Sequence, residues 1–209
     1  MPIQLDEVEA RVLGSLAEKA LTVREQYPLT FNSLLAACNQ KTSREPVMNL
    51  DLDTMGRAVQ SLIDKGLAER VQAPGDRVPK FRHRISELLG TDDPRITGIF
   101  IVLLLRGPQT SGEIKGRSER LCRFAGTTEV EGLMQELAAR PDPMAARLPR
   151  QAGQKETRFA HLFSGAPAAS AGDTMPHGVP VPLQPDRLAD LEARVAALEA
   201  AVAALKDPA

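Results

Sequence analysis

Apolar residues in the first ninety positions recur at a helical spacing in some segments and cluster in short runs between turns in others. A spacing of three or four residues predicts amphipathic helices in three segments, 5–21, 31–38 and 53–65. Apolar residues bounded by turn signals predict short extended segments at 28–30, 67–71 and 79–85. Asp53 is expected to cap the third helix, and Lys65 followed by Gly66 to end it. The predicted order is helix, short strand, helix, helix, strand, turn, strand.

The same order of elements starts again at Pro94. Residues 95–105 are apolar on most helical faces, which predicts a buried helix. Two pairs match the capping-box pattern and predict the starts of the next two helices, Thr110 with Glu113 and Thr128 with Glu131. Residues 144–150 and 157–163 are expected to close this second copy as a hairpin around Gly153.

Short sequence matches support this duplication. Four segments of the first half recur in the second half in the same order, at offsets between 75 and 80: Pro28-Leu29-Thr30 with Pro108-Gln109-Thr110, Val59-Gln60-Ser61-Leu62 with Met134-Gln135-Glu136-Leu137, Ala68-Glu69-Arg70-Val71 with Ala145-Ala146-Arg147-Leu148, and Lys80-Phe81-Arg82-His83 with Arg158-Phe159-Ala160-His161. Such a period is too long for a solenoid repeat and suits a small domain. A helix-turn-helix core with an added β-hairpin is a winged helix. The expected fold is therefore mainly α with small β-hairpins, an α+β class, with tandem winged-helix domains at 1–90 and 91–164.

The rest of the chain has a different composition. Residues 165–185 are rich in Ala, Gly and Pro, which predicts a flexible linker. The segment 186–206 has a heptad pattern that predicts a C-terminal amphipathic helix with apolar residues at a and d: Leu188, Leu191, Val195, Leu198, Val202 and Leu205. Valine at a with leucine at d favours a parallel two-stranded coiled coil, and hence a homodimer. The alternative is a helix that folds back onto its own chain, because short coils are marginal in water.

Composition narrows the class of protein. The chain has 209 residues with 43% hydrophobic side chains, enough for real cores, and its two cysteines fit a reducing cytoplasm. Its charged start is unlike a signal peptide, and the longest apolar run, 99–105, is too short to span a membrane. The net charge is −1, and basic and acidic residues number 12 and 12 in 1–90, 11 and 9 in 91–164, and 3 and 6 in 165–209. Because no part is strongly basic, tight nonspecific binding to nucleic acid is not predicted.

Several segments resemble one known family. They are the segment 5–16 (LDEVEARVLGSL), Tyr27-Pro28-Leu29-Thr30, Ala37-Cys38-Asn39-Gln40-Lys41, Arg44-Glu45-Pro46-Val47-Met48 and Leu104-Leu105-Arg106-Gly107-Pro108-Gln109-Thr110. Together they are similar to the bacterial YceH family, and the resemblance extends to about residue 163. It implies a tandem winged-helix fold and a cytoplasmic protein, and it supplies no biochemical activity.

A winged helix usually reads DNA with the N-terminal part of its third helix, while the hairpin contacts the DNA backbone. Here both third helices begin with acids, Asp51 and Asp53 in the first copy and Glu129 and Glu131 in the second. Phosphates would repel these carboxylates, which also complement the positive end of a helix dipole. Basic residues lie in three other patches, the loop after the second helix, the first hairpin and the second copy's middle helix: Lys41, Arg44, Arg77, Lys80, Arg82, Arg84, Lys115, Arg117 and Arg120. These are the candidate DNA contacts, and the alternative is an ordinary solvated surface.

The sequence favours two functions almost equally. One is a DNA-binding, transcription-regulator-like protein. The other is a protein-interaction module that uses the winged-helix fold to hold a protein partner. DNA binding is favoured if the predicted DNA contacts of the first hairpin and the middle helix share one face: Lys80, Arg82, Arg84, Arg117 and Arg120. A protein partner is favoured if they scatter beside an apolar groove.

No pattern in the sequence indicates an enzyme. His83 and His161 occupy equivalent positions in the two predicted hairpins, but neither has a Cys or carboxylate neighbour at metal-ligand spacing. We therefore expect a structural role for both, and buried inert thiols for Cys38 and Cys122. The sequence has no glycine-rich phosphate loop after a strand and no nucleophile elbow. No catalytic residue, metal or cofactor is expected.

Overall fold

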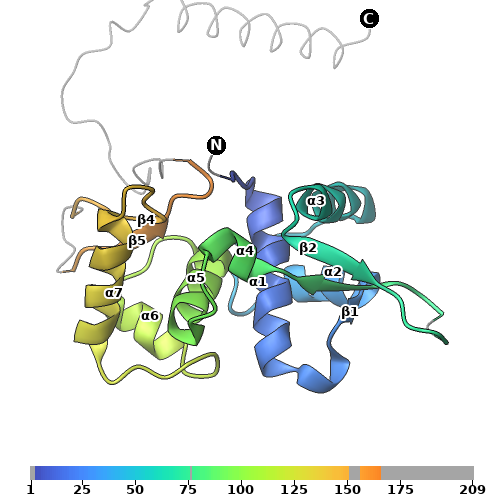
Figure 1. Cartoon of the computed structure of the whole chain (residues 1–209), viewed down its shortest axis with the longest axis horizontal. Coiled ribbons are helices and arrows are strands. Elements are labelled where there is room, and N and C mark those ends of the chain that lie inside the picture. Colours follow the sequence, from blue (N-terminus) through green and yellow to red (C-terminus); the bar gives the residue numbers. More distant parts are fainter. Residues whose placement is uncertain (1–2, 76, 151–155, 166–209) are drawn as a thin grey trace, which may run out of the picture. The chain divides into compact units, whose positions relative to one another are not determined.

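The computed structural model describes residues 3–75, 77–150 and 156–165, and in these residues the chain is an α+β protein (Figure 1). The described residues form seven α-helices: α1 (Glu7–Thr22), α2 (Phe31–Cys38), α3 (Leu52–Asp64), α4 (Ile85–Leu89), α5 (Pro94–Arg106), α6 (Ser111–Arg117) and α7 (Thr127–Ala139). A short 3-10 helix, η1 (Arg24–Gln26), follows α1. The strands are β1 (Leu29–Thr30), β2 (Ala68–Val71), β3 (Lys80–His83), β4 (Ala145–Arg147) and β5 (Phe159–His161).

Helix positions follow the predicted pattern closely. Helix α1 begins with a capping box, because Asp6 accepts from the backbone N–H of Glu9 at 2.7 Å and Glu9 accepts from that of Asp6 at 2.7 Å. The prediction of a helix over 31–38 is confirmed by α2. The capping box predicted at Thr110 and Glu113 is also confirmed, at the start of α6.

The two antiparallel sheets use the same pairing register. The first sheet has the strand order β1-β3-β2, and the second contains β4 and β5. Two pairs of the first half have an equivalent in the second half. Leu29–Phe81 corresponds to the isolated bridge Gln109–Phe159, and Ala68–His83 corresponds to Ala145–His161. Partners in these pairs are related by the offsets of 77 to 80 residues that the sequence matches show. The backbone pairing therefore repeats along the chain as the sequence does.

Two predicted helix starts are wrong. The N-cap of α3 is Asp51, not Asp53, because the Asp51 carboxylate accepts a backbone N–H of the first turn at 2.7 Å. Helix α7 follows Gly126 without a side-chain cap, so the capping box expected from Thr128 and Glu131 does not start it. Both errors have one cause, since several acids and threonines near each helix start can match a capping pattern.

The second hairpin strand of the first half is shorter than predicted. Strand β3 ends at His83, and Ile85 begins the short helix α4, so the strand expected over 79–85 is wrong at its end. Ile85, Leu88 and Leu89 are buried, and they lie on one face of a helical turn that covers the core. Burial of these three side chains accounts for the change from strand to helix.

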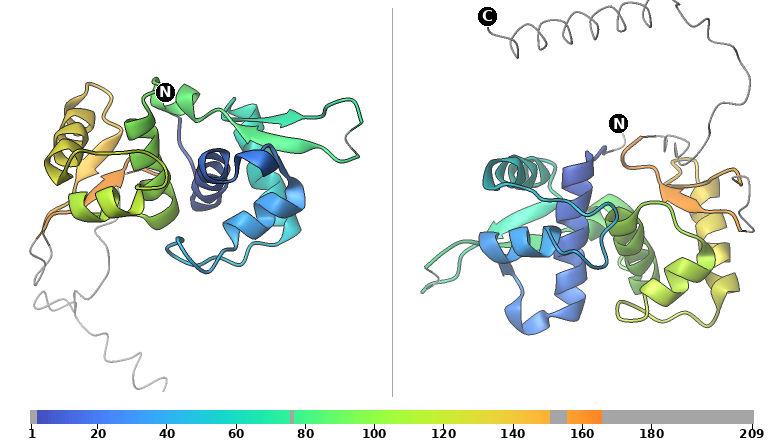
Figure 2. Two further views of the ribbon diagram at one scale, coloured as in Figure 1. Left: turned by 90° about the horizontal axis from the view of Figure 1, so that it is seen from below. Right: turned by 180° about the vertical axis from the view of Figure 1, so that it is seen from behind.

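Helix α1 packs along α5 and connects the two halves of the chain (Figure 1, Figure 2). Gly14 allows the close approach, because a Cβ at this position would lie 3.0 Å from Leu105 Cδ2 and 3.1 Å from Leu104 Cβ. The Leu5 N–H donates to the carbonyl of Phe163 at 2.7 Å. One continuous core of buried apolar side chains therefore includes residues from both halves.

All described residues belong to one compact unit. The division into domains 1–90 and 91–164 therefore stays a prediction. Apart from Gly165, the predicted linker 165–185 and heptad helix 186–206 lie outside the described residues, as does Gly153. In the described part of the chain, no helix is both long enough and apolar enough to cross a membrane.

Candidate functional site

The loop between α2 and α3 is held in place by polar side chains. The Asn39 amide donates to the carbonyl of Leu50 at 2.9 Å and accepts from its N–H at 2.8 Å, which joins the two ends of the loop. Arg11, which is 1% exposed, donates to the carbonyl of Pro46 at 2.6 Å. The N–H of Glu45 donates to a carbonyl of α5 at 2.9 Å. This loop is therefore an ordered surface that leads into α3.

Arg44 lies inside this loop, and the structure contradicts the surface position expected for it. Its side chain is fully enclosed, pairs with the Glu18 carboxylate at 2.7 Å and donates to the carbonyl of Ala37 at 3.1 Å. Burial alone would raise the pKa of Glu18, but the hydrogen bonds and charge of Arg44, together with Lys19, lower that pKa below its ordinary value. Lys41 of the same loop is exposed, as expected.

The start of α3 presents acids and exposed apolar side chains together. Asp51 caps the helix, and Asp53 lies exposed in its first turn. Leu52 between them is 57% exposed, and Val47 in the preceding loop is also 57% exposed. This surface combines negative charge with apolar area and carries none of the predicted DNA contacts.

The start of α7 differs, because its acid has local partners. Glu129 accepts from the backbone N–H of Ala125 at 2.7 Å and from the guanidinium of Arg95 at 2.9 Å. These hydrogen bonds lower the pKa of Glu129. The carboxylate therefore stabilises the helix start and the contact with α5.

Two arginines of the first hairpin region are paired with neighbouring acids. Arg82 on β3 forms an ion pair with Glu69 on β2. Arg84 pairs with Glu87 at 3.0 Å, and it lies at the start of α4, outside β3. A strand over the whole of 79–85 would place Arg84 on the same face as Arg82, but β3 ends at His83, before Arg84.

The tip of this hairpin is mixed in character. Arg77 is exposed there, and the next residue, Val78, is 51% exposed. Lys80 is half-buried at the start of β3. The hairpin therefore presents cations, acids and an apolar side chain, not a continuous basic strip.

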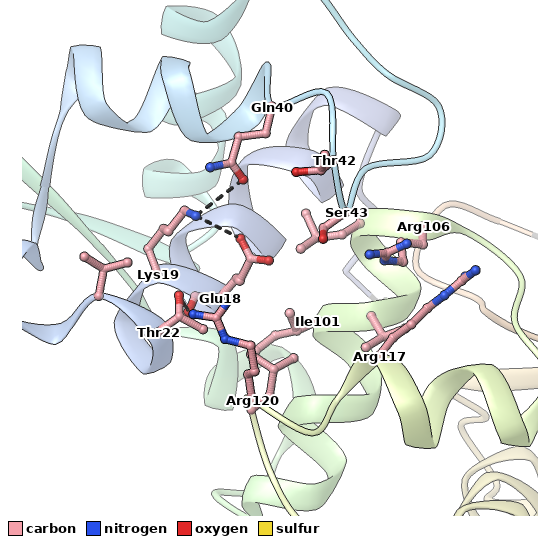
Figure 3. A pocket seen from close by; sticks show the side chains of 14 residues that line it. Glu18, Lys19, Thr22, Gln40, Thr42, Ser43, Ile101, Arg106, Arg117 and Arg120 are labelled. Carbon is pink, nitrogen blue, oxygen red and sulfur yellow. Dashed lines mark hydrogen bonds and ion pairs between the residues drawn. The ribbon is translucent and has the colours of Figure 1, made fainter.

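Arg117 and Arg120 meet at a pocket of about 250 Å³ between α1, the α2–α3 loop, α5 and the end of α6 (Figure 3). Its charged lining comprises four basic side chains and one carboxylate: Lys19, Arg106, Arg117, Arg120 and Glu18. Apolar side chains line it as well, from α5 and the segment after α6: Ile101, Val102, Leu105 and Leu121. The hairpin cations are absent from this described lining, and Lys115 lines a separate pocket with Arg123. The predicted DNA contacts therefore divide between separate surfaces.

The sequence predictions missed two basic residues of this pocket, Lys19 and Arg106. Each lies in the last turn of a helix, α1 and α5 respectively. A cation there ordinarily complements the negative end of the helix dipole, so its presence signals no binding site. Only the packing of α1 on α5 brings these two helix ends to the same pocket as Arg117.

The described histidines and cysteines are buried or half-buried. Burial lowers the pKa of His161 to about 4, and its Nδ1 is buried with no hydrogen-bond partner among the described residues. The backbone N–H of His83 donates to the Tyr27 hydroxyl at 2.7 Å. Cys38 is buried and Cys122 half-buried, and burial raises the pKa of both thiols. The described residues contain no group of three or more His, Cys, Asp or Glu placed to hold a metal.

These features define the class as a small α+β protein with a basic interhelical pocket. The family described as "Protein of unknown function, DUF480" matches residues 5–154, and the chain belongs to this family, which confirms the resemblance seen in the sequence. A UPF0502 protein of Geotalea daltonii is 48% identical over 176 residues, covering 84% of this chain and 80% of the relative. One of Geobacter sulfurreducens is 48% identical over 200 residues, covering 94% and 90%. One of Chromobacterium violaceum is 45% identical over 207 residues, covering 97% and 91%.

Proposed function

We propose that this chain is a non-enzymatic protein of two winged-helix modules that binds a protein partner through the start of α3. The repeated order of helix, strand, helix, helix and hairpin supports the winged-helix assignment, as does the repeated β register. In such a module, the start of the third helix is the part that usually recognises the partner. The chemistry of the start of α3 is the observation that carries the proposal.

That surface suits an apolar and basic segment of a protein. The described residues include three large apolar side chains that are more than half exposed; Leu52 is the first residue of α3, and Val47 lies in the loop that leads into it. Asp51 and Asp53 flank Leu52. Apolar anchors with a charged rim are typical of protein interfaces, whereas DNA phosphates would be repelled by the two carboxylates. The partner therefore presents an apolar side chain beside Lys or Arg residues.

The test compares Leu52→Asp with Val78→Asp, a matched control at a side chain of similar exposure, 57% against 51%. We expect a protein retained from a bacterial lysate by the full wild-type chain and by Val78→Asp, but not by Leu52→Asp. The retained protein is then purified and its affinity measured by calorimetry, where Leu52→Asp should weaken binding by about tenfold or more. Equal affinity of the purified partner for both variants would contradict the proposal, as would loss of binding in Val78→Asp alone.

A charge reversal separates a protein partner from DNA. Asp53→Lys should weaken binding of the basic partner and should improve any binding of duplex DNA, because it removes a carboxylate and adds a cation at the same place. Asp53 lies exposed in the first turn of α3, where its charge complements the helix dipole, so the charge reversal should lower the free energy of unfolding by about 1 kcal/mol, which leaves the chain folded. Stronger partner binding in this variant would refute the charge argument.

Duplex DNA is the second candidate partner, favoured by exposed cations away from α3. Lys41 and Arg77 are exposed, whereas Arg82 and Arg84 are already paired with acids. Binding to a random duplex is measured across salt concentrations. Each lost phosphate contact should lower the salt slope by about one, so Lys41→Ala/Arg77→Ala should lower it by about two. No binding at low salt, or an unchanged slope, would exclude DNA contacts at these residues.

A further inference from the structure

The pocket of Figure 3 holds more positive charge than its own acid neutralises. Lys19, Arg106, Arg117 and Arg120 line it, together with one carboxylate, that of Glu18. Glu18 is already engaged, because it pairs with the enclosed Arg44 at 2.7 Å and with Lys19 at 3.4 Å. One carboxylate, already paired, therefore offsets only part of the charge of the four cations that line the pocket.

Arg106 and Arg117 form a pair of like charges at one side of this pocket. Gln109 accepts a hydrogen bond from Arg117, and Glu113 lies 3.6 Å from its guanidinium, so Arg117 is held in place. Burial lowers the pKa of Arg106, and the charge of Arg117 lowers it further. The charges of Glu45 and Glu18 act on the Arg106 pKa in the opposite direction, but no acid among the described residues forms an ion pair with its guanidinium. An anion placed between the two arginines would offset their repulsion.

The other side of the pocket is basic and apolar. Figure 3 shows Arg106 beside Ser43 with the Arg117 guanidinium beyond it, and Arg120 across the pocket toward Thr22, with Ile101 between the two sides. Within the described part of the chain, the Arg120 side chain forms no ion pair. A bound molecule would therefore meet guanidinium groups at its ends and hydrocarbon in the middle.

We propose that this pocket binds a small organic phosphate, with its phosphate between Arg106 and Arg117 and its carbon part over Ile101. Planar guanidinium groups match phosphate oxygens in pairs, which favours phosphate over a monovalent anion. The volume of about 250 Å³ equals that of about eight water molecules, which admits a phosphate with a small ring or chain. No residue of α3 lines the pocket, so the inference goes beyond the proposed protein contact and fails or stands independently of it.

The test uses the full chain, phenyl phosphate and isothermal titration calorimetry. Phenyl phosphate should bind more tightly than inorganic phosphate, because only its ring covers the apolar side chains. Arg106→Ala should weaken binding by roughly tenfold to a hundredfold, the range for a charged hydrogen bond. Arg106→Lys should retain part of the affinity. Arg123→Ala is the matched control, since Arg123 is exposed in the segment after α6 but lines a different pocket.

Competition with a random duplex distinguishes a free phosphate from the phosphate of DNA. Phenyl phosphate binding that depends on Arg106 and is unaffected by duplex supports the proposal. Displacement of phenyl phosphate by duplex would assign the pocket to a DNA phosphate and overturn the small ligand. The absence of binding at millimolar phenyl phosphate, or equal affinities of Arg106→Ala and Arg123→Ala, would overturn the phosphate site itself.

Discussion

Replacing Arg44 by methionine removes the cation that anchors the α2–α3 loop while keeping a long side chain in its place. The Arg44 side chain is fully enclosed, and that of Glu18 is 16% exposed. In Arg44→Met, Glu18 would face only Lys19, at 3.4 Å. The carbonyl of Ala37, which accepts from Arg44 at 3.1 Å, would lose this donor.

The expected loss of stability follows from these contacts. Removing one member of a buried ion pair typically costs about 3–5 kcal/mol. The nearby Lys19 and the partial exposure of Glu18 place Arg44→Met at the lower end, about 3 kcal/mol. With a urea m-value of about 2 kcal/mol/M, the unfolding midpoint should fall by about 1.5 M. Arg57→Met is the control, because Arg57 is exposed and its one described hydrogen bond, to Thr54, is 3.3 Å long.

The pH dependence separates the charge from the packing. Because the folded-state pKa of Glu18 is lowered from 4.5, its pair with Arg44 stabilises the fold above this pH and loses that contribution as pH falls through the lowered value. The difference between wild type and Arg44→Met in urea unfolding should therefore shrink at acidic pH. Glu18→Gln added to Arg44→Met should recover part of the loss. A midpoint shift under about 0.5 M, or a difference that is the same at neutral and acidic pH, would show that the Arg44–Glu18 pair does not stabilise the fold to this extent.

Three further outcomes follow from the structure and the sequence. Gly98→Ala should lower the free energy of unfolding by about 1–3 kcal/mol, because a Cβ would overlap the Cys122 sulfur. Adding Cys122→Ala should recover much of this loss, and urea unfolding of the two single variants and the double variant measures the recovery. His161 has a folded-state pKa of about 4, lowered by burial from 6.5, so stability should fall as pH drops from 6.5 toward 4. Thermal unfolding should show a weaker dependence of stability on pH in His161→Phe, and an unchanged dependence in this variant would contradict the role of His161. Sedimentation should show a chain ending at Ser164 as a monomer if the heptad helix forms the dimer, whereas equal self-association of both chains would rule that contact out.

Periodic segments were the predictable part of the fold. Residues 31–38 and 95–105 carry a clear apolar spacing, and α2 and α5 lie within a residue of those bounds. The repeated Phe-x-His segment also predicted equivalent hairpin strands, which pair in the same register. Helix α4 could not be predicted in this way. Its three apolar residues span less than two helical turns, too few to distinguish a helix from a strand.

Burial of charged side chains was the unpredictable part of the candidate site. A polar loop containing Arg44 reads as exposed, but its partner Glu18 lies 26 residues earlier in the chain and cannot be inferred from local sequence. Arg106 likewise resembles an ordinary helix end, and the pocket it lines is assembled from four separate segments. Charge patterns alone therefore located Arg117 and Arg120 but not the site that they share.

The packing of α1 has a consequence for how the protein is made. Gly14 rests against α5, and the Leu5 N–H reaches Phe163, 158 residues later in the chain. A ribosome therefore finishes the whole first half while the α5-facing side of α1 still has nothing to cover it. Nascent chains that stop before α5 would display this apolar side to chaperones and proteases. The core of the first half is therefore completed only after α5 has been synthesised.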